Sequence, residues 1–296
     1  MFWKKRRSKD KFTALLRFGR ILRWGVRILL LILIVDFFYL AVTWPDWKKI
    51  ASGAVPKSAF ISDYQAQQAQ HKTQPRLRWQ PVPLSTIPKH MIRAVILAED
   101  SRFYQHSGFD LVAFKEAMDY NFNKGRFVLG ASTISQQTAK NLFLNAAKNP
   151  LRKWHELILT WGMERHLSKK RILEIYFNVA EFGPGIYGVQ AAAQAYWGLG
   201  AGQLSVAQAA ELAATLPSPV KNNPATHTRH FAKRAKKILS LLERYPGDAA
   251  ETIYPRHPDL FEPENAEPPA DENEPPPIAN ESKPPVEEGS VPMNPL

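Results

Sequence analysis

The sequence predicts an all-α domain that is preceded by a single membrane-spanning helix. One observation is a long apolar run close to the N-terminus. The other is a series of helix-capping patterns between residues 80 and 250, where no strand-like alternation dominates. The chain has 296 residues, enough for a sizeable core, and no internal repeat. It has no cysteine, which excludes disulfides, iron–sulfur clusters, cysteine nucleophiles and thiolate metal sites.

The predicted transmembrane helix covers residues 28–44 and contains one charged residue, Asp36. At about 1.5 Å per residue it is roughly 26 Å long, close to the thickness of a bilayer core. Asp36 costs roughly 3 kcal/mol at the centre of a span, and the apolar residues around it outweigh that cost. Because the run is long and no small-x-small cleavage site follows it, we expect an uncleaved anchor rather than a signal peptide.

Basic residues flank this span on its N-terminal side. Residues 1–27 carry ten Lys or Arg and one Asp, which predicts that they stay in the cytoplasm and that the chain after about residue 45 lies outside. A nucleic-acid-binding arm is the weaker interpretation, since the apolar run follows directly. Residues 45–79 contain several glutamines and are predicted to form an exposed connector between membrane and domain.

Helix-capping signals divide residues 80–250, the predicted domain, into at least seven helices. Thr133 with Gln136, and Ser205 with Gln208, form capping boxes, in which side chains satisfy free backbone N–H groups of the first turn. The expected helices cover residues 85–100, 110–125, 133–146, 150–166, 168–178, 205–215 and 228–245.

The chain ends in a segment that we expect to be disordered. Residues 251–296 hold eleven Asp or Glu against two Lys or Arg and are rich in proline. This tail and the basic N-terminal segment cancel each other, at about −9 and +9, so the domain itself carries the net charge of +12. Such a charge favours an anionic partner: nucleic acid, a membrane surface or a phosphate-bearing substrate.

Glu99 is the first candidate for chemistry, in the polar string at 98–110. It lies near the carboxyl end of an expected helix, where the helix dipole, partial burial and the neighbouring Asp100 all raise the pKa of its carboxyl. A base with a pKa nearer neutrality suits proton abstraction from a sugar hydroxyl. Taken alone, the same string also fits a solvated acidic pair at the end of a helix.

A second string, residues 130–144, offers a candidate anion site. Ser132 and Thr133 open a helix whose free backbone N–H groups can hold an anion. Lys140 follows two turns after Thr133, on the same face. Taken alone, this string also fits an ordinary capped helix with a polar outer face.

Two further strings add charge. In residues 152–156, Arg152, Lys153 and Glu156 can share one helix face, as the three residues of a surface salt-bridge cluster would. In residues 168–188, three basic residues precede an apolar face that is typical of a core helix. Neither string determines a function alone.

Together, in this order and spacing, the four strings resemble the glycosyltransferase domain of peptidoglycan polymerases, glycosyltransferase family 51. That domain occurs in bifunctional penicillin-binding proteins and in monofunctional biosynthetic transglycosylases. Its motifs EDxxFxxHxG, GxSTIxQQxxKN, RKxxE and KxxILExYxN match the strings that begin at Glu99, at Gly130, at Arg152 and at Lys170 or its neighbours. Ala131 replaces a glycine that is common in the second motif. The resemblance covers about residues 80–245, which leaves nothing for a transpeptidase domain and favours the monofunctional branch.

The resemblance implies a lysozyme-like fold with a membrane-associated helical jaw. It implies an enzyme that polymerises lipid II into linear glycan strands, with inversion at the anomeric carbon and release of undecaprenyl diphosphate. The expected location is the bacterial inner membrane, with a periplasmic domain. The expected partners are lipid II, the nascent glycan strand, the membrane and cell-division or cell-wall synthesis proteins, without nucleic acid.

The resemblance also implies roles for individual residues. The catalytic residues are Glu99 and Glu156. Glu156 has two alternative roles: it orients the cations, or it holds a divalent cation, Mg²⁺ or Mn²⁺, near the diphosphate. Glu174, Tyr176 and Asn178 are expected to be structural. The substrate-binding residues are Asp100, Phe103, His106, Gly108, Ser132, Thr133, Gln136, Gln137, Lys140, Asn141, Arg152 and Lys153. An alternative role for Asp100 and His106 is to fix the geometry around Glu99.

The charge pattern fits this reaction. A glycosidase needs an acid to protonate its leaving group, whereas a diphosphate departs without a proton if positive charge stabilises it. One base, Glu99, and a cluster of cations are therefore expected. One alternative is a lysozyme-like enzyme or lytic transglycosylase that cleaves peptidoglycan, which would not need the cations. The other is a non-catalytic, membrane-anchored scaffold, for which Glu99→Gln would leave function intact.

Overall fold

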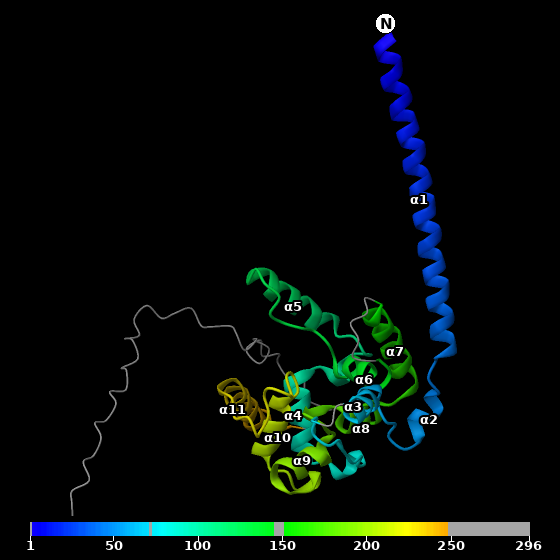
Figure 1. Ribbon diagram of the computed structural model, residues 1–296. Helices are drawn as coiled ribbons and strands as arrows, with labels where there is room; N and C mark the ends of the chain where they lie inside the picture. The colour runs from blue at the N-terminus through cyan, green and yellow to red at the C-terminus, as the bar shows by residue number, and fades with distance from the viewer. Residues whose placement is uncertain (1, 71–72, 145–150, 248–296) are drawn as a thin grey trace, which may run out of the picture.

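The computed structural model describes residues 2–70, 73–144 and 151–247, with side chains described from residue 19 onward. One long helix, α1 (Phe2–Val42), rises from a helical domain (Figure 1). The remaining elements form that domain around one core.

Part of α1 is long and apolar enough, by length and composition, to cross a membrane: Gly19–Val42. The span predicted at 28–44 lies within α1 except for its last two residues. The helix stops early because Trp44 precedes Pro45, and the proline ring disfavours helical backbone in the residue before it.

The helices predicted for the domain are present, with shifts at their ends. The first begins as a 3₁₀ turn, η1 (Leu84–Thr86), and helix α6 ends at Phe143 instead of near residue 146. Pro150, expected in a first turn, lies outside the described residues. One helix, α9, was not predicted. The helices are α4 (Lys89–Glu99), α5 (Leu111–Asn123), α6 (Ile134–Phe143), α7 (Arg152–His166), α8 (Lys169–Val179), α9 (Val189–Trp197), α10 (Val206–Thr215) and α11 (Arg229–Arg244).

The caps read from the sequence are confirmed. Both capping boxes, at Thr133 and Ser205, are formed in both directions. Asp110 accepts a hydrogen bond from the backbone N–H of Ala113, 2.9 Å away, and so starts α5. Because α6 begins at its capping box, the backbone N–H groups of its first turn are fixed next to the end of α4.

Residues 45–79 are not simply an exposed connector. They fold into α2 (Trp47–Ser52), α3 (Ala59–Gln70) and a short strand, and Trp47 and Ile61 are buried in the core. The glutamines on which the prediction rested do lie largely at the surface. The opposite face of α3 is apolar and packs against α6, and the glutamines between its residues obscured this pattern in the sequence.

A small three-stranded sheet departs from the all-α prediction. Its strands are β1 (Arg78–Trp79), β2 (Glu181–Gly183) and β3 (Ile186–Tyr187), in the order β1-β3-β2. Strand β1 is parallel to β3, and β2 is antiparallel to it. Strands of two or three residues are too short to show the alternation by which a strand is recognised.

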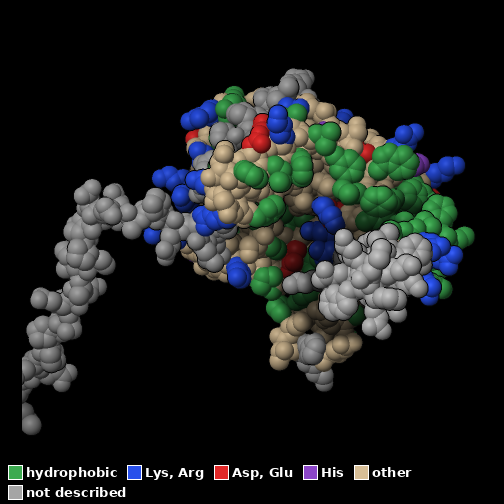
Figure 2. Space-filling model, turned by 90° about the horizontal axis from the view of Figure 1, so that it is seen from above, with side chains coloured by type: hydrophobic (Ala, Val, Ile, Leu, Met, Phe, Trp, Pro, Cys, Tyr) green, Lys and Arg blue, Asp and Glu red, His purple; other side chains and the backbone are tan. Residues whose placement is uncertain are grey.

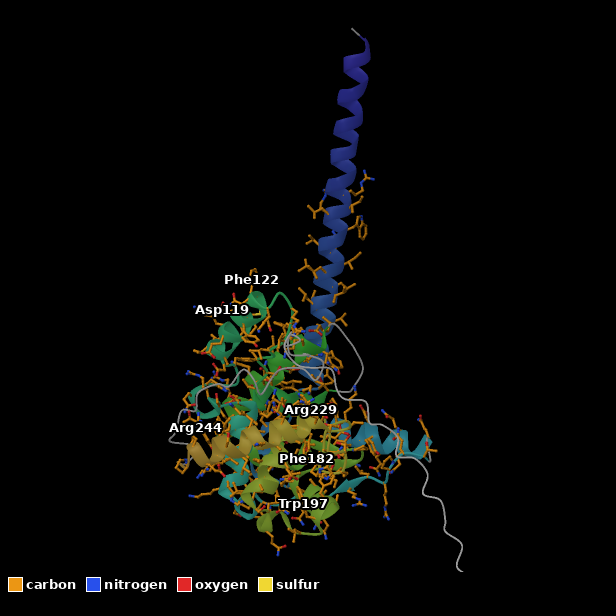
Figure 3. The ribbon with its side chains drawn as sticks, turned by 90° about the vertical axis from the view of Figure 1, so that its left-hand side faces the viewer. Asp119, Phe122, Phe182, Trp197, Arg229 and Arg244 are labelled. Atoms are coloured by element: carbon orange, nitrogen blue, oxygen red, sulfur yellow. The ribbon has the colours of Figure 1, made fainter. Side chains whose placement is uncertain are left out.

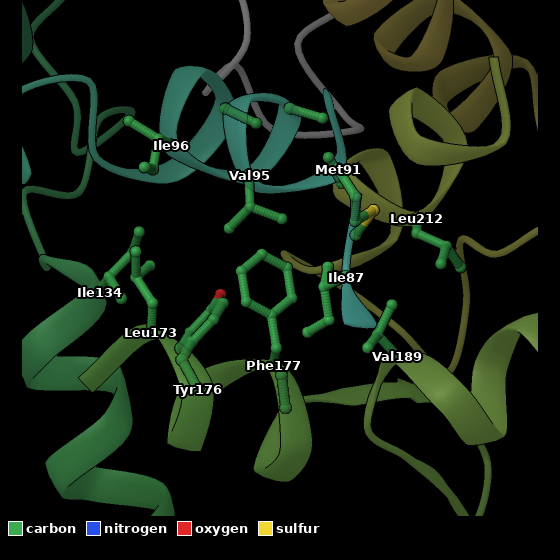
Figure 4. Close-up of a cluster of buried hydrophobic side chains, with 14 of the residues drawn as sticks. Ile87, Met91, Val95, Ile96, Ile134, Leu173, Tyr176, Phe177, Val189 and Leu212 are labelled. Atoms are coloured by element: carbon green, nitrogen blue, oxygen red, sulfur yellow. The ribbon is translucent and has the colours of Figure 1, made fainter. Parts of the chain in front are cut away.

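The core lies between α4, α8 and α10. Figure 4 shows Met91, Val95 and Ile96 of α4 above Tyr176 and Phe177 of α8, and all five are fully buried. This mostly helical architecture confirms the all-α prediction and fits a lysozyme-like fold. Since Glu99 follows Val95 by one turn of the same helix, the core also fixes the position of Glu99.

Helix α5 lies at the end of the domain nearest to α1. In Figure 3, Asp119 and Phe122 of α5 are on the side from which α1 rises, whereas Phe182 and Trp197 lie at the far end. The amide of Asn121 ties α5 to the chain that returns from it, accepting from the N–H groups of Val128 and Leu129 at 2.7 Å each. Helix α5 is thus the projecting, jaw-like element of this fold.

Candidate active site

Glu99 ends α4 and is held by two partners. Arg234 Nη2 donates to Glu99 Oε1 at 3.0 Å, and Gln137 Nε2 donates to Glu99 Oε2 at 2.9 Å. The side chain is only 9% exposed. Burial, the largest influence, raises the pKa of the Glu99 carboxyl; Arg234 and Gln137 oppose this rise and Asp100 adds to it. The predicted direction of the pKa shift is therefore confirmed.

Gln137 connects Glu99 to the core. Its Oε1 accepts a hydrogen bond from the hydroxyl of Tyr176, 3.2 Å away. Tyr176 is fully buried, which raises the pKa of its hydroxyl well above the usual value and keeps it a donor. Since Tyr176 must donate to the amide oxygen, the amide nitrogen of Gln137 is directed at Glu99.

A cluster of charges lies on α6 and α7: Lys140, Arg152, Lys153 and Glu156. Glu156 is buried and forms a salt bridge with Lys153, one turn before it. Burial lowers the pKa of Lys140; Glu156 raises it, Arg152 and Lys153 lower it, and Glu99 raises it. Lys140 is therefore close to both the cation pair and the base, and it connects the two halves of the site.

A cleft opens beside Glu99. Its walls include Ser101 on the α4 side, Asp110 and Ala113 at the start of α5, and the segment from Gly130 to Thr133. In Figure 2, seen from the side on which α1 rises, acidic and basic side chains lie together in a hollow of the surface. The structure thus combines a buried carboxylate, a cluster of cations and an opening.

Two predicted substrate-binding residues are buried in the protein. Phe103 is fully buried, with Lys169 Nζ 4.4 Å from its ring centroid. His106 Nε2 bonds to Asp100, 2.9 Å away, and its Nδ1 accepts from the Gly108 N–H at 3.1 Å. The prediction that Phe103 contacts substrate is wrong, because the fold encloses its ring. The bonds of His106 fit its alternative role, which is to fix the geometry around Glu99.

Gly108 has a structural role instead of the predicted contact with substrate. Its φ of +94° suits glycine, and a Cβ there would lie 2.9 Å from Thr160 Cγ2. Its carbonyl accepts from the Thr133 hydroxyl at 2.6 Å. Thr133 lines the cleft but is occupied by this bond and by its cap. Gln136 is buried, and its amide oxygen accepts a hydrogen bond from the Thr133 N–H at 3.0 Å. The Thr133 hydroxyl and the Gln136 amide oxygen are therefore engaged within the fold.

Asp100 and the remaining predicted residues divide between structure and site. The Asp100 carboxylate accepts from the backbone N–H of Ile134 at 2.9 Å, as well as from His106, so it fastens α4 to the start of α6. Ser132 is exposed at the cleft, and Asn141 is half-buried beside Lys140. Asn178 bonds to Val82 at both backbone groups, as expected of a structural residue.

Arg234 is the functional residue that the sequence analysis missed. It lies on α11 among Phe231, Ala235 and Ile238, the buried side of an amphipathic helix, and is itself buried. A cation at core spacing was the available signal, since an arginine is almost never buried without a partner. Its partner, Glu99, is too distant in the sequence to be found from periodicity.

Among the described residues, one other carboxyl, that of the half-buried Glu181 of β2, has a pKa that desolvation raises to about 7. Burial raises the pKa values of Tyr64, Tyr187 and Tyr196, and the charge of Glu181 raises them further. Its neighbour Phe182 lies at the far end of the domain from α5 (Figure 3). Glu181 is therefore separate from the cation cluster, and Glu99 remains the candidate base.

Large apolar side chains surround the site on the α1 side. On and after α5 they are Leu111, Val112, Phe114, Met118, Phe122 and Phe127, and on α7 they are Trp154 and Trp161. Together they form an exposed apolar surface much larger than single exposed residues, which is typical of membrane or partner contact. Lys115, Lys124 and Arg126 are exposed among the α5 residues and can meet anionic headgroups.

Comparison with known proteins identifies the family. The transglycosylase family model matches residues 66–243. The biosynthetic peptidoglycan transglycosylase of Nitrosospira multiformis is 40% identical over 220 residues, which cover 73% of this chain and 94% of that protein. Proteins of the same name from Methylobacillus flagellatus and Chromobacterium violaceum are 43% and 44% identical, over 64% and 58% of this chain and 82% and 75% of theirs. The chain therefore belongs to the transglycosylase family.

Proposed function

We propose that this protein is a membrane-anchored peptidoglycan glycosyltransferase that polymerises lipid II into linear glycan strands. The observation that carries the proposal is the juxtaposition of Glu99, a buried carboxylate with a raised pKa, and the cations Lys140, Arg152 and Lys153. A base and a cation cluster are the two requirements of transfer from a diphosphate donor. Membership of the transglycosylase family supports it.

Glu99 acts as the general base in this proposal. It takes the proton from the 4-hydroxyl of the acceptor as that oxygen attacks the anomeric carbon of the donor. Gln137 and Arg234 hold the two oxygens of its carboxylate in place and favour its ionised form. The bond from the anomeric carbon to the diphosphate oxygen breaks, and the single displacement inverts the configuration.

The cations stabilise the departing diphosphate. Lys140, Arg152 and Lys153 supply positive charge where negative charge develops, so no acid is required. Glu156 orients them, through its salt bridge to Lys153. This donor set does not suit Mg²⁺ or Mn²⁺, because it offers one carboxylate that is already paired with a lysine. The mechanism therefore relies on the side-chain cations.

The domain works at the outer surface of the inner membrane. The apolar helix Gly19–Val42 supports a single-pass anchor, and the basic residues before it support a cytoplasmic N-terminus. The apolar surface of α5 and α7 then faces the bilayer that contains the lipid substrate. Tethering restricts the search for substrate to two dimensions and raises its effective concentration.

The test is polymerisation of purified lipid II by the full chain in detergent, with products separated by size. We expect polymer from the parent and a loss of about a thousandfold in rate for Glu99→Gln. Glu243→Gln, an exposed carboxylate on α11, is the matched control and should remain active. No polymer from a folded parent would remove the polymerase proposal, while polymer from Glu99→Gln would remove Glu99 as the base.

A further inference from the structure

One polar contact joins the membrane-spanning helix to the domain. His155 Nε2 of α7 lies 2.5 Å from Asp36 Oδ1 of α1, and the ring of Tyr39 stacks on His155 at a centroid distance of 5.5 Å. The side chains of His155 and Asp36 are only 10% and 8% exposed. The carboxylate of Asp36, within the predicted membrane span, is therefore paired with one specific side chain of the domain, His155.

The direction of Asp36 within α1 supports a specific role. Its neighbours Val35 and Phe37 are 60% and 67% exposed and face outward, where lipid would lie. A carboxylate within a membrane span is unfavourable, and charged residues that persist there usually mark functional positions. Asp36 faces α7 instead of lipid. The unfavourable free energy of a carboxylate within the span is therefore offset by its hydrogen bond to His155.

The contact continues along the same face of α7. Gly162, seven residues after His155, packs against Trp44 and Trp47: a Cβ at Gly162 would lie 2.8 Å from the Trp47 ring and 3.0 Å from the Trp44 ring. His166, one turn further, stacks on Trp47 with centroids 5.8 Å apart. One face of α7 therefore meets Asp36 and Tyr39 of α1 and, further along, Trp44 and Trp47, which follow α1 in the chain.

The same helix carries part of the candidate site on another face. Arg152 and Lys153 lie in its first turn, and Glu156 directly follows His155. Consecutive helix residues point about 100° apart, so α7 can hold the anchor with His155 and the cation cluster with Glu156. Any shift of α7 against α1 would move the cations relative to the membrane.

We propose that the Asp36–His155 hydrogen bond is a positioning contact for catalysis. It sets the depth and angle of α7 at the membrane surface, and through α7 it places Arg152 and Lys153 against the lipid-borne diphosphate. Neither Asp36 nor His155 touches the substrate. This inference rests on the proposed function, since it assumes that the cations bind the diphosphate.

The test measures kcat and KM separately for lipid II polymerisation by the full chain. We expect Asp36→Leu to lower kcat about tenfold and to change KM less than about twofold, because misplaced cations affect mainly the transition state. The double variant Asp36→His with His155→Asp re-forms the pair with its members exchanged and should recover most of the lost kcat. Phe37→Leu, at the neighbouring lipid-facing position, is the matched control and should match the parent.

The outcomes distinguish the inference from the proposed function. If the parent polymerises lipid II and Asp36→Leu has the same kcat, the positioning role is wrong. A change confined to KM also overturns it, since the anchor would then control only access to substrate. The double variant supplies a further check. If it has the unfolding temperature of the parent but the kcat of Asp36→Leu, the contact itself has no role. A parent without polymer contradicts the proposed function instead.

Discussion

Arg234 donates a hydrogen bond to Glu99 over 3.0 Å, although 135 residues separate them in the chain. The same guanidinium reaches the carbonyl of Ala98 at 3.3 Å, so it grips the last turn of α4 as well as the carboxylate. Burial acts against the charged form of Glu99, and Arg234 is the strongest influence in favour of it. The pair therefore decides how much of the base is ionised at neutral pH.

Replacing Arg234 tests this relationship. In Arg234→Gln the buried carboxyl loses its cation, so its pKa rises further and the acidic limb of the pH–rate profile moves to higher pH. At neutral pH we expect a rate loss of about tenfold or more, which recovers in part as the pH is raised. The measurement is the pH dependence of kcat. Arg234→Lys retains the charge and should move the limb less.

An unmoved acidic limb in Arg234→Gln would contradict the proposed pairing, provided that the variant remains folded. Thermal unfolding of both variants supplies that check. The partial recovery at high pH is the informative feature, because a variant that is merely damaged loses rate at every pH.

Lys140 controls the opposite limb of the profile. Its pKa is lowered by burial and by Arg152 and Lys153, and it must stay protonated to stabilise the diphosphate. Activity should therefore fall as the pH rises through this lowered pKa, earlier than for an ordinary lysine. In Lys140→Arg the charge is permanent, so the alkaline limb should move to higher pH. Lys140→Gln should lose about a hundredfold or more in kcat.

The control for this prediction is Lys236→Arg, an exposed lysine on α11. It should leave both limbs unchanged. An alkaline limb that is the same in Lys140→Arg and the parent would show that another group titrates there.

The elements that the sequence predicted are those whose signals are local. Thr133 and Gln136 identify the start of α6 because the capping box is complete within four residues. Helix α9 has no such signal: its N-cap is Gly188, with φ of +83° and no side chain to cap the helix. Strand β1 is defined by its pairing with β3, more than 100 residues later, and a two-residue strand carries no pattern of its own.

The site was predictable where chemistry and motif coincide, at Glu99 and Lys140. It was not predictable where residues that match the motif have a structural role instead. Phe103 and His106 belong to the same motif as Glu99, yet Phe103 is fully buried and His106 is bonded to Asp100. Arg234 shows the reverse case: it lies outside all four motifs, yet it contacts the candidate base directly.

Phe103 gives a direct test of that distinction. As a core residue, Phe103→Ala should lower the free energy of unfolding by about 3–5 kcal/mol, because it leaves a cavity beneath Lys169. Phe103→Leu should cost less than about 1.5 kcal/mol and leave KM for lipid II unchanged. Thermal unfolding and KM are measured on the same preparations. A raised KM in a stable Phe103→Leu would restore the substrate-binding role.

Helix α5 offers the last prediction, on how the domain meets the membrane. Phe122 is 87% exposed and lies on the α1 side of the domain (Figure 3). If it enters the bilayer, Phe122→Ser removes apolar burial of about 1.5–3 kcal/mol, and KM for lipid II in vesicles should rise about tenfold. Because Phe122 touches no residue of the base or the cation cluster among the described contacts, kcat should remain unchanged. Val220→Ser, an exposed apolar residue outside α5, should leave both constants as they are. An unchanged KM for Phe122→Ser, or an equal effect of Val220→Ser, would show that α5 does not enter the membrane.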